Sequence, residues 1–438
     1  IRMTFAQTKY VMVKLKFPLL VICSIISLGI LFLVEKFYRN CGLGHNKPRM
    51  LAYQTIEQIE MHLSMHSKVF HRALPDRCRE ETFHFIKMFK NPCWIEKFSE
   101  DYIEQFMSNP YFANKSKIVQ KYVKEKKYMI QHGINIQMRC LPYYFLLGQP
   151  KSGTTDLFHR INLHPQVIEP LLKGPNWWTR RRYSLNSSDS LTFAQYIDVF
   201  TPLAHTLFQA VLDKTSVAID YPHVTGDSST STLWDQSIIK KNFVASGNKT
   251  DVDVMMCLNS VLPNKKFIVI LRNPVCRLYS DYLYFAANES DCNPDKFHEL
   301  VLTSIANWAR CTSHSTTYTC ALKDEFVHSP VRITVGMYSV FLEQWFHYFN
   351  PSHFFIVKFE EYRRDTKTVL AGVFQHLGLG NITEDGWKVI LSNPVKNKNH
   401  LRGKMYNKTA DVLKAFYDRF NRQLVRLLGD EKFSWLDQ

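Results

Sequence analysis

Residues 143–155 read YYFLLGQPKSGTT, an apolar run followed by a short loop with two glycines. Residues 156–161, DLFHRI, continue as a helical stretch. A strand that enters a helix through a tight loop directs backbone N–H groups and the positive end of the helix at one point, which suits a phosphate group. The stretch therefore predicts an α/β fold with an anion site between Gly148 and Thr155, where Lys151 adds a positive charge.

The loop is close to the nucleoside-triphosphate loop but differs from it in one respect. That motif, G-x-x-x-x-G-K-[ST], has its lysine directly after the second glycine. Here Lys151 precedes Gly153, which disfavours a nucleotide kinase. An ordinary strand-to-helix turn with a surface lysine is the simpler alternative to a phosphate site.

A second apolar run, KFIVIL at residues 266–271, ends directly before Arg272. Ligands of open parallel sheets bind beyond the carboxyl ends of the strands, where Arg272 is expected to lie. Arg277 and Ser280 are three residues apart, so they share one face of the helix expected after Pro274. Arginines and a hydroxyl in one place suit a second phosphate group, because guanidinium binds phosphate through two hydrogen bonds. A helix with solvated arginines is the alternative.

Other segments extend the α/β pattern. Apolar runs predict a strand near residues 354–359 and a weaker one near 216–220, and their alternation with helical stretches indicates a parallel sheet. Helices are expected over residues 335–348 and 408–428. The apolar face expected for the second helix consists of Val412, Phe416, Phe420, Leu424 and Leu427.

Taken together, the two loop segments resemble the nucleotide-binding signatures of the sulfotransferases. The first is similar to the loop for the 5′-phosphosulfate of 3′-phosphoadenosine 5′-phosphosulfate (PAPS), and the second to the site for its 3′-phosphate. The resemblance runs from about residue 85 to the C-terminus and includes segments 140–142, 175–180, 231–235, 278–286 and 335–338. These segments are similar to a Golgi branch of the family that sulfates the 6-hydroxyl of N-acetylgalactosamine 4-sulfate.

This resemblance implies a fold, a donor and an acceptor. The fold is a P-loop-like central parallel sheet flanked by helices, the donor is PAPS, and the acceptor is a glycosaminoglycan of the chondroitin or dermatan sulfate type. No metal is required. Lys151 is expected to stabilise charge on the bridging oxygen as the sulfuryl group leaves. Residues 401–405 resemble a loop that closes over the nucleotide. The implied donor-binding residues are Gln149, Pro150, Lys151, Ser152, Gly153, Thr154, Thr155, Arg272, Ser280, Arg402, Gly403 and Lys404.

The base for the acceptor hydroxyl is not evident. Where the resembled family reads Lys-Glu-Pro-His-Trp-Trp, with Glu as the expected base, residues 173–178 read KGPNWW, so Gly174 replaces the glutamate. Asp227 is the candidate replacement as a catalytic residue, although Asp-Ser-Ser is also good helix-capping chemistry. Alternatively the enzyme works slowly, because a general base contributes about 10²–10⁴-fold. A third alternative is a relative that binds PAPS or glycan without turnover.

The acceptor is expected to contact four side chains of the same region: Lys173, Trp177, Trp178 and Arg180. The tryptophans would form a wall against sugar faces, while the arginines at 180–182 would bind sulfate or carboxylate groups. Packing of both tryptophans in the core is the alternative.

The N-terminal part of the chain predicts a membrane anchor. Residues 17–34 form an uncharged apolar run of about the length that spans a bilayer. We expect a cytoplasmic tail at 1–16, a transmembrane signal anchor at 17–34, a stem at 35–85 and a lumenal sulfotransferase domain at 86–438. This organisation is that of a single-pass type II protein of the Golgi membrane. A cleaved signal peptide is the alternative.

Charge and cysteine content agree with a lumenal glycan-modifying protein. The net charge of +16 favours a polyanionic partner, here a sulfated glycan and not nucleic acid. A homo-oligomer is compatible with the sequence. Cys311 and Cys320 are close enough in sequence to form a small disulfide loop, and the family resemblance implies a second pair, Cys93 with Cys140. N-x-[ST] sequons predict glycosylation at Asn114, Asn186, Asn248, Asn288 and Asn381.

Overall fold

The computed structural model describes residues 83, 85–113, 116–183, 190–212, 221–236, 253–285, 293–396 and 403–436. The expected cytoplasmic tail, the transmembrane anchor and nearly all of the stem lie outside these residues. Within the described ranges, no helix is both long and apolar enough to cross a membrane.

Four parallel strands form the central sheet in the order β4-β3-β5-β6. Their bounds are Tyr144–Gly148 for β3, Gly226–Asp227 for β4, Phe267–Leu271 for β5 and Phe354–Lys358 for β6. The predicted parallel α/β sheet is confirmed, and three predicted strands agree with β3, β5 and β6 to within one residue. The weak strand expected at 216–220 lies outside the described residues, and the fourth strand described is β4.

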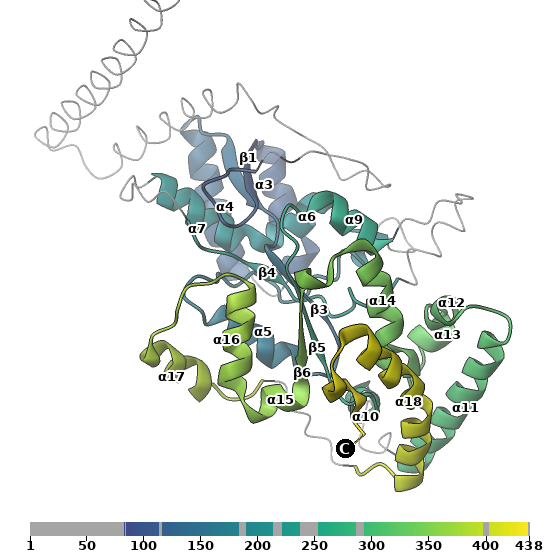
Figure 1. Ribbon diagram of the computed structural model, residues 1–438. Coiled ribbons are helices and arrows are strands. Elements are labelled where there is room, and N and C mark those ends of the chain that lie inside the picture. The colour runs from purple at the N-terminus through teal and green to yellow at the C-terminus, as the bar shows by residue number, and fades with distance from the viewer. Residues whose placement is uncertain are drawn as a thin grey trace, which may run out of the picture. The chain divides into compact units, whose positions relative to one another are not determined.

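Helices cover both faces of this sheet, and the strand sequences show why. In β5, Phe267, Val269 and Leu271 belong to one core cluster, whereas Ile268 and Ile270 belong to the other. Successive side chains of a strand point to opposite faces, and every residue of β5 is buried, as in parallel sheets covered on both sides. Helices α10, α14 and α18 pack on the first face, and α5 and α16 on the second (Figure 1).

The helices fall into three groups according to where they lie. Before and beside β2 (Ile136–Cys140) are α3 Glu100–Met107, α4 Ser116–Gln131, α6 Phe193–Ile197 and α7 Thr201–Leu212. The first face carries α9 Val254–Val261, α10 Pro274–Phe285, α11 Pro294–Thr312, α12 Thr317–Ala321, α13 Asp324–Val327, α14 Tyr338–Tyr348 and α18 Asn407–Leu428. The second face carries α5 Thr154–Asn162, α15 Phe359–Arg364, α16 Thr366–His376 and α17 Glu384–Ser392.

The expected C-terminal helix is present as α18, but its buried face is rotated from the predicted one. Leu413 and Tyr417 are fully buried together with Phe420 and Leu424, whereas Val412, Phe416 and Leu427 are only partly buried. Tyr417, which is not among the predicted apolar residues, packs its ring in the core while its hydroxyl donates to the carbonyl of Ile333 at 2.7 Å. A prediction from apolar residues alone therefore misplaced the buried face of α18.

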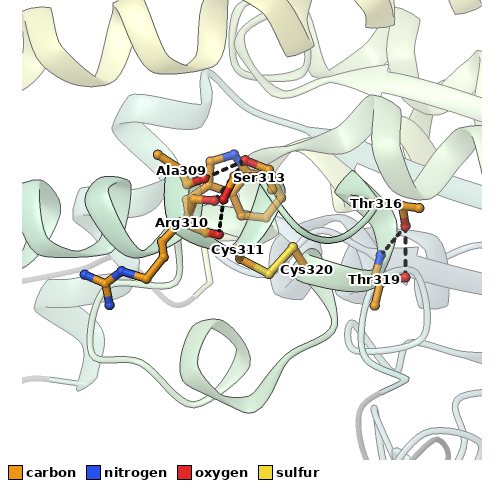
Figure 2. The surroundings of a disulfide bond; sticks show 9 residues. Ala309, Arg310, Cys311, Ser313, Thr316, Thr319 and Cys320 are labelled. Carbon is orange, nitrogen blue, oxygen red and sulfur yellow. Dashed lines mark hydrogen bonds between the residues drawn. A yellow bond between two sulfur atoms is a disulfide. The ribbon is translucent and has the colours of Figure 1, made fainter.

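Both expected disulfides are present. β1 (Cys93–Lys97) and β2 (Ile136–Cys140) pair antiparallel, and Cys93 lies opposite Cys140, to which it is bonded. The second disulfide, Cys311–Cys320, joins the end of α11 to α12 (Figure 2). The short connection between them is held by Thr316, whose hydroxyl oxygen accepts from the Thr319 N–H at 3.2 Å.

Of the predicted glycosylation sites, Asn381 is exposed between α16 and α17. Asn114, Asn186, Asn248 and Asn288 lie outside the described residues.

Candidate active site

The loop after β3 contains two residues in the left-handed region, Lys151 with φ 66° and Gly153 with φ 85°. Gly153 is required for a second reason, because a Cβ there would lie 2.8 Å from the ring of Phe359. The Gln149 N–H donates to the carbonyl of Ile270 at 2.9 Å, which ties the loop to β5. Thr154 then begins α5, so the N-terminus of this helix faces the loop as predicted.

Three buried side-chain atoms in the loop have no hydrogen-bond partner among the described residues. They are the hydroxyl of Ser152 and both polar atoms of the Gln149 amide. Buried polar groups are nearly always hydrogen-bonded in folded proteins. The loop therefore fits a site whose hydrogen bonds are completed by a bound polar ligand.

Arg272 brings the second motif to the first. It follows β5 directly, and its Nη1 donates to the backbone carbonyl of Lys151 at 3.1 Å. The Tyr338 hydroxyl holds the Arg272 carbonyl at 2.6 Å, and the guanidinium lies over the Phe359 ring at 5.1 Å. Arg272, directly after β5, and the loop after β3 thus form one site.

The rest of the second motif lies on α10. Ser280 is partly exposed there, and among the described residues no hydrogen bond or ion pair joins it to the loop. Arg277, expected beside it as a second phosphate ligand, is completely buried. Its guanidinium pairs with Asp281 at 3.2 Å and donates to the Arg332 carbonyl at 3.1 Å. Arg277 is therefore a structural residue and not a phosphate ligand.

Two lysines meet at the start of α5. The Lys173 amine donates to the Thr155 hydroxyl at 3.0 Å. Burial, reinforced by the charge of Lys151, lowers the pKa of Lys173 to about 8. Burial also lowers the pKa of Lys151 to about 8; Asp281 opposes this shift, and Arg272 and Arg332 add to it. Burial, together with the crowding of positive charge, disfavours the protonated amines until an anion arrives.

The position of the missing glutamate is closed by neighbouring backbone. A Cβ on Gly174 would lie 2.8 Å from the Ser228 carbonyl oxygen. The Ser228 N–H donates to the Lys173 carbonyl at 2.9 Å, which holds the two segments together. Asn176 follows in the left-handed region with φ 50°, a conformation that Asn tolerates, and its N–H donates to the Ser229 hydroxyl at 2.8 Å. Backbone packing thus excludes a side chain at position 174, so the change from glutamate to Gly174 alters the packing as well as removing a carboxylate.

Asp227, the candidate replacement base, is completely buried. Its two oxygens accept from the Tyr196 hydroxyl at 2.9 Å and the Ser229 N–H at 2.7 Å. Burial raises the pKa of Asp227 to about 6, against the lowering effect of these hydrogen bonds. The contact to Ser229 is a turn interaction of the kind Asp makes two residues ahead, and no described helix begins at this point.

Trp177 and Trp178 lie in the core and not on a sugar-binding wall. They are 2% and 1% exposed. Trp177 stacks on Tyr196, and Trp178 donates to the Tyr196 hydroxyl at 3.0 Å. This burial favours the core alternative. Arg180 remains 40% exposed and pairs with Asp235 at 2.7 Å.

The third predicted donor segment is described only in part. Arg402 lies outside the described residues, and Gly403 and Lys404 precede α18 with the Lys404 side chain exposed. Within the part of the chain that the structure describes, no hydrogen bond or ion pair joins them to the loop after β3. Across the described ranges, no group of three or more His, Cys, Asp or Glu side chains could hold a metal ion.

Two neighbours of Lys151, one aromatic and one basic, were not predicted from the sequence. The Lys151 amine lies over the Tyr284 ring, 3.6 Å from its centre. Arg332 lies close enough to lower the Lys151 pKa. Tyr284 could have been found, because it is four residues after Ser280 and lies on the same helix face. Arg332 reaches the site only through tertiary packing.

A parallel α/β sheet with a glycine loop after β3 and an arginine after β5 is typical of proteins that bind phosphorylated ligands beyond the carboxyl ends of the strands. The Sulfotransferase domain family matches residues 141–412, so the chain belongs to the sulfotransferases and is an enzyme of that class.

Curated relatives carry this similarity over most of the chain. Human carbohydrate sulfotransferase 15 is 30% identical over 89% of this chain and 74% of the relative. The mouse protein of the same name is 31% identical over 80% of this chain and 66% of the relative. Among solved structures, a sulfotransferase from Alicyclobacillus acidocaldarius is 16% identical, with a TM-score of 0.37 over 66% of this chain and 96% of that chain. That structural similarity is low and adds nothing to the assignment.

Proposed function

We propose that this enzyme transfers the sulfuryl group of PAPS to a hydroxyl of a chondroitin or dermatan sulfate chain, at the 6-position of N-acetylgalactosamine 4-sulfate. The observation that carries the proposal is the meeting of Lys151, Lys173 and Arg272 at the N-terminus of α5. Family membership supports the donor, and the names of the curated relatives support a carbohydrate acceptor.

The chain's own residues fit the two ends of this donor. The N–H groups of residues 152–155 and the helix N-terminus suit the 5′-phosphate, and the Ser152 hydroxyl offers an unused hydrogen-bonding group. Arg272, with Ser280 on α10, suits the 3′-phosphate. When bound, PAPS supplies an activated sulfuryl group, which leaves behind 3′-phosphoadenosine 5′-phosphate (PAP).

Lys151 and Lys173 supply the electrostatic part of catalysis. Their amines lie at the loop and at Thr155, where negative charge develops as the sulfuryl group departs. Preorganised positive charge in a water-poor site stabilises such a transition state strongly. An anionic donor would also raise the pKa of both amines from about 8, so that they remain charged during the reaction.

The acceptor proton is the weaker part of the scheme. Gly174 offers no carboxylate, and both oxygens of Asp227 are already hydrogen-bonded. We therefore propose that the cations carry most of the rate, that the proton of the acceptor hydroxyl passes to solvent water as the sulfuryl group is transferred, and that Asp227 acts by holding the backbone at Ser229. Losing a general base costs about 10²–10⁴-fold and does not abolish transfer.

The test is transfer of labelled sulfate from PAPS by the purified full chain to a panel of acceptors. The panel contains chondroitin 4-sulfate, chondroitin 6-sulfate, dermatan sulfate and unsulfated chondroitin. We expect label on the 4-sulfated chains, and a transfer rate lower by about 10²–10³-fold or more with Lys151→Ala. Binding of PAPS without label on any of these acceptors would favour the alternative of a binding protein without turnover.

We also propose the cellular setting from the sequence: an anchor at residues 17–34 in the Golgi membrane with the enzyme domain in the lumen. The two disulfides and the exposed sequon at Asn381 are compatible with an oxidising, glycosylating compartment. Protection of the domain from protease in intact vesicles, and its loss on adding detergent, would test the topology.

A further inference from the structure

A continuous run of side chains leads away from Lys151. Cations and aromatic rings alternate along much of it, and each step is a direct contact. We call it the cation–aromatic run; in order it consists of Lys151, Tyr284, Phe285, Arg332, Trp234 and Arg180.

The first half of the run comes from the end of α10. The Lys151 amine lies 3.6 Å from the centre of the Tyr284 ring. That ring packs edge-on against Phe285 with centres 5.1 Å apart. The guanidinium of Arg332 lies 4.7 Å from the centre of the Phe285 ring. Tyr284 and Phe285 are 53% and 62% exposed, which is unusual for large aromatic side chains that serve only the core.

The second half of the run is built on Trp234. This indole is buried, and two guanidinium groups converge on it: Arg332 at 5.4 Å and Arg180 at 5.8 Å from its centre. Arg180 is the exposed end of the run. Cation–π contacts of this kind hold an arginine in place while leaving its edge free for other partners.

Each arginine is also oriented by a buried carboxylate. Arg332 donates to both oxygens of Asp281 through Nε and Nη2, at 2.9 and 2.5 Å. Arg180 donates to Asp235 at 2.7 Å. Asp281 also forms an ion pair with Arg277, so one carboxylate is shared by two arginines there. The run therefore carries an excess of fixed positive charge that is positioned before any ligand binds.

We propose that the cation–aromatic run is the acceptor-binding surface for an anionic sugar chain. The exposed Tyr284 and Phe285 rings pack against sugar faces beside Lys151. Arg332 and Arg180 bind sulfate or carboxylate groups on the sugars next to the one that is modified. This inference rests on the proposed function, because it takes the Lys151 end of the run as the place of transfer.

The geometry explains a preference for an acceptor that is already charged. A neutral sugar could use the rings but would bring no anion to the N–H groups of Arg332 and Arg180 that Asp281 and Asp235 do not engage. A chain with a regular negative charge satisfies rings and arginines together, as charge-assisted hydrogen bonds to guanidinium are stronger than neutral ones. The run thus recognises a polyanionic polysaccharide more tightly than its uncharged counterpart.

The test measures binding separately from transfer. Oligosaccharides of chondroitin 4-sulfate and of unsulfated chondroitin, matched in length, are titrated into the full chain in the presence of PAP. The variants are Arg332→Gln, Arg180→Gln and Phe285→Ala, and the control is Arg422→Gln, an exposed arginine on α18 that pairs with Asp418. Melting temperatures and the Kd for PAP show that each variant is folded and that its donor site is intact.

We expect Arg332→Gln and Arg180→Gln each to weaken binding of the sulfated oligosaccharide about tenfold. We expect them to change binding of the unsulfated one far less, and Phe285→Ala to weaken both alike. Arg422→Gln should change neither. If Arg180→Gln and Phe285→Ala bind both oligosaccharides as the unaltered protein does, the proposal is wrong.

The two proposals can fail separately. Tight, arginine-dependent binding without transfer of label would contradict the proposed function and leave the binding surface in place. Transfer to chondroitin sulfate with a KM that none of the three variants changes would contradict the binding surface and leave the proposed function in place.

Discussion

The donor side and the acceptor side of this site are built in different ways. The donor side is a local structure: residues 148–155 turn directly from β3 into α5, and Arg272 follows the neighbouring strand. The acceptor side joins segments that are distant in sequence, with residues 173–180 held against 227–235 and Arg332 arriving from a third region. The donor side therefore follows from a motif, whereas the acceptor side follows only from packing.

The donor side and the acceptor side also differ in how far their polar groups are already hydrogen-bonded. On the donor side the buried Ser152 hydroxyl has no hydrogen-bond partner among the described residues, and burial lowers the pKa of Lys151 to about 8. On the acceptor side, the residues that would supply a base are occupied: Asp227 is bonded at both oxygens, and Gly174 has backbone where a side chain would begin. We infer that the donor side dominates the rate.

The largest effect is expected from removing the Lys151 amine. Lys151→Ala should lower the transfer rate by about 10²–10³-fold or more, because a preorganised charge at the reacting group is lost. The rate of label transfer from PAPS under saturating donor measures it. Lys388→Ala, an exposed lysine on α17, is the control and should retain full activity. A Lys151→Ala enzyme within tenfold of the unaltered one would contradict the assignment.

A side chain at Gly174 should disturb the acceptor side as a whole. Gly174→Ala places a Cβ 2.8 Å from the Ser228 carbonyl oxygen, and overpacking of this kind costs about 1–3 kcal/mol. We expect a lower free energy of unfolding in a denaturant titration, and a larger loss with Gly174→Glu. Gly380→Ala is the control, since its Cβ would meet only the flexible Gln166 side chain at 3.2 Å. A more active Gly174→Glu enzyme would show instead that a base was simply missing.

Donor binding should weaken as the pH rises. Lys151 and Lys173 have pKa values of about 8, so their amines are charged below pH 8 and lose the charge above it. Each of the two amines should contribute about a tenfold rise in the Kd for PAP between pH 7 and pH 9, since the charged fraction of one amine with a pKa of about 8 falls by about that factor over this range. Lys151→Arg, which stays charged, should flatten the curve. A Kd that is constant over this range in the unaltered protein would contradict the lowered pKa values.

The smallest effect is expected at Asp227. Asp227→Asn keeps an oxygen for one of the two donors that the carboxylate holds, so we expect the transfer rate to stay within about tenfold of the original. A general base would cost about 10²–10⁴-fold when removed. The transfer rate and the melting temperature together separate a positioning role of Asp227 from a general-base role. Loss of positioning should lower both quantities.

The donor side could be predicted from the sequence because its chemistry is carried by neighbours along the chain. The strand at 143–147, the glycine loop and the arginine after 266–271 each have a local signal, and the sheet and the Lys151–Arg272 contact agree with it. The disulfide Cys311–Cys320 is a further local feature that spacing suggested.

The rest depends on tertiary burial that no local pattern reports. Trp177 and Trp178 look like an acceptor wall in sequence, yet Tyr196 from α6 covers them. Arg277 looks like a phosphate ligand, yet Asp281 and the Arg332 carbonyl enclose it. The buried face of α18 was misplaced because Tyr417 is polar at one end only and packs as an aromatic.

The comparison of the two sides is tested most directly by single-turnover transfer of label from PAPS to chondroitin 4-sulfate with two variants in parallel. The account predicts that Lys151→Ala reduces the rate constant by about 10²–10³-fold or more while Asp227→Asn stays within about tenfold. A larger loss in Asp227→Asn than in Lys151→Ala, with both proteins folded, would contradict it and move the centre of catalysis to the acceptor side.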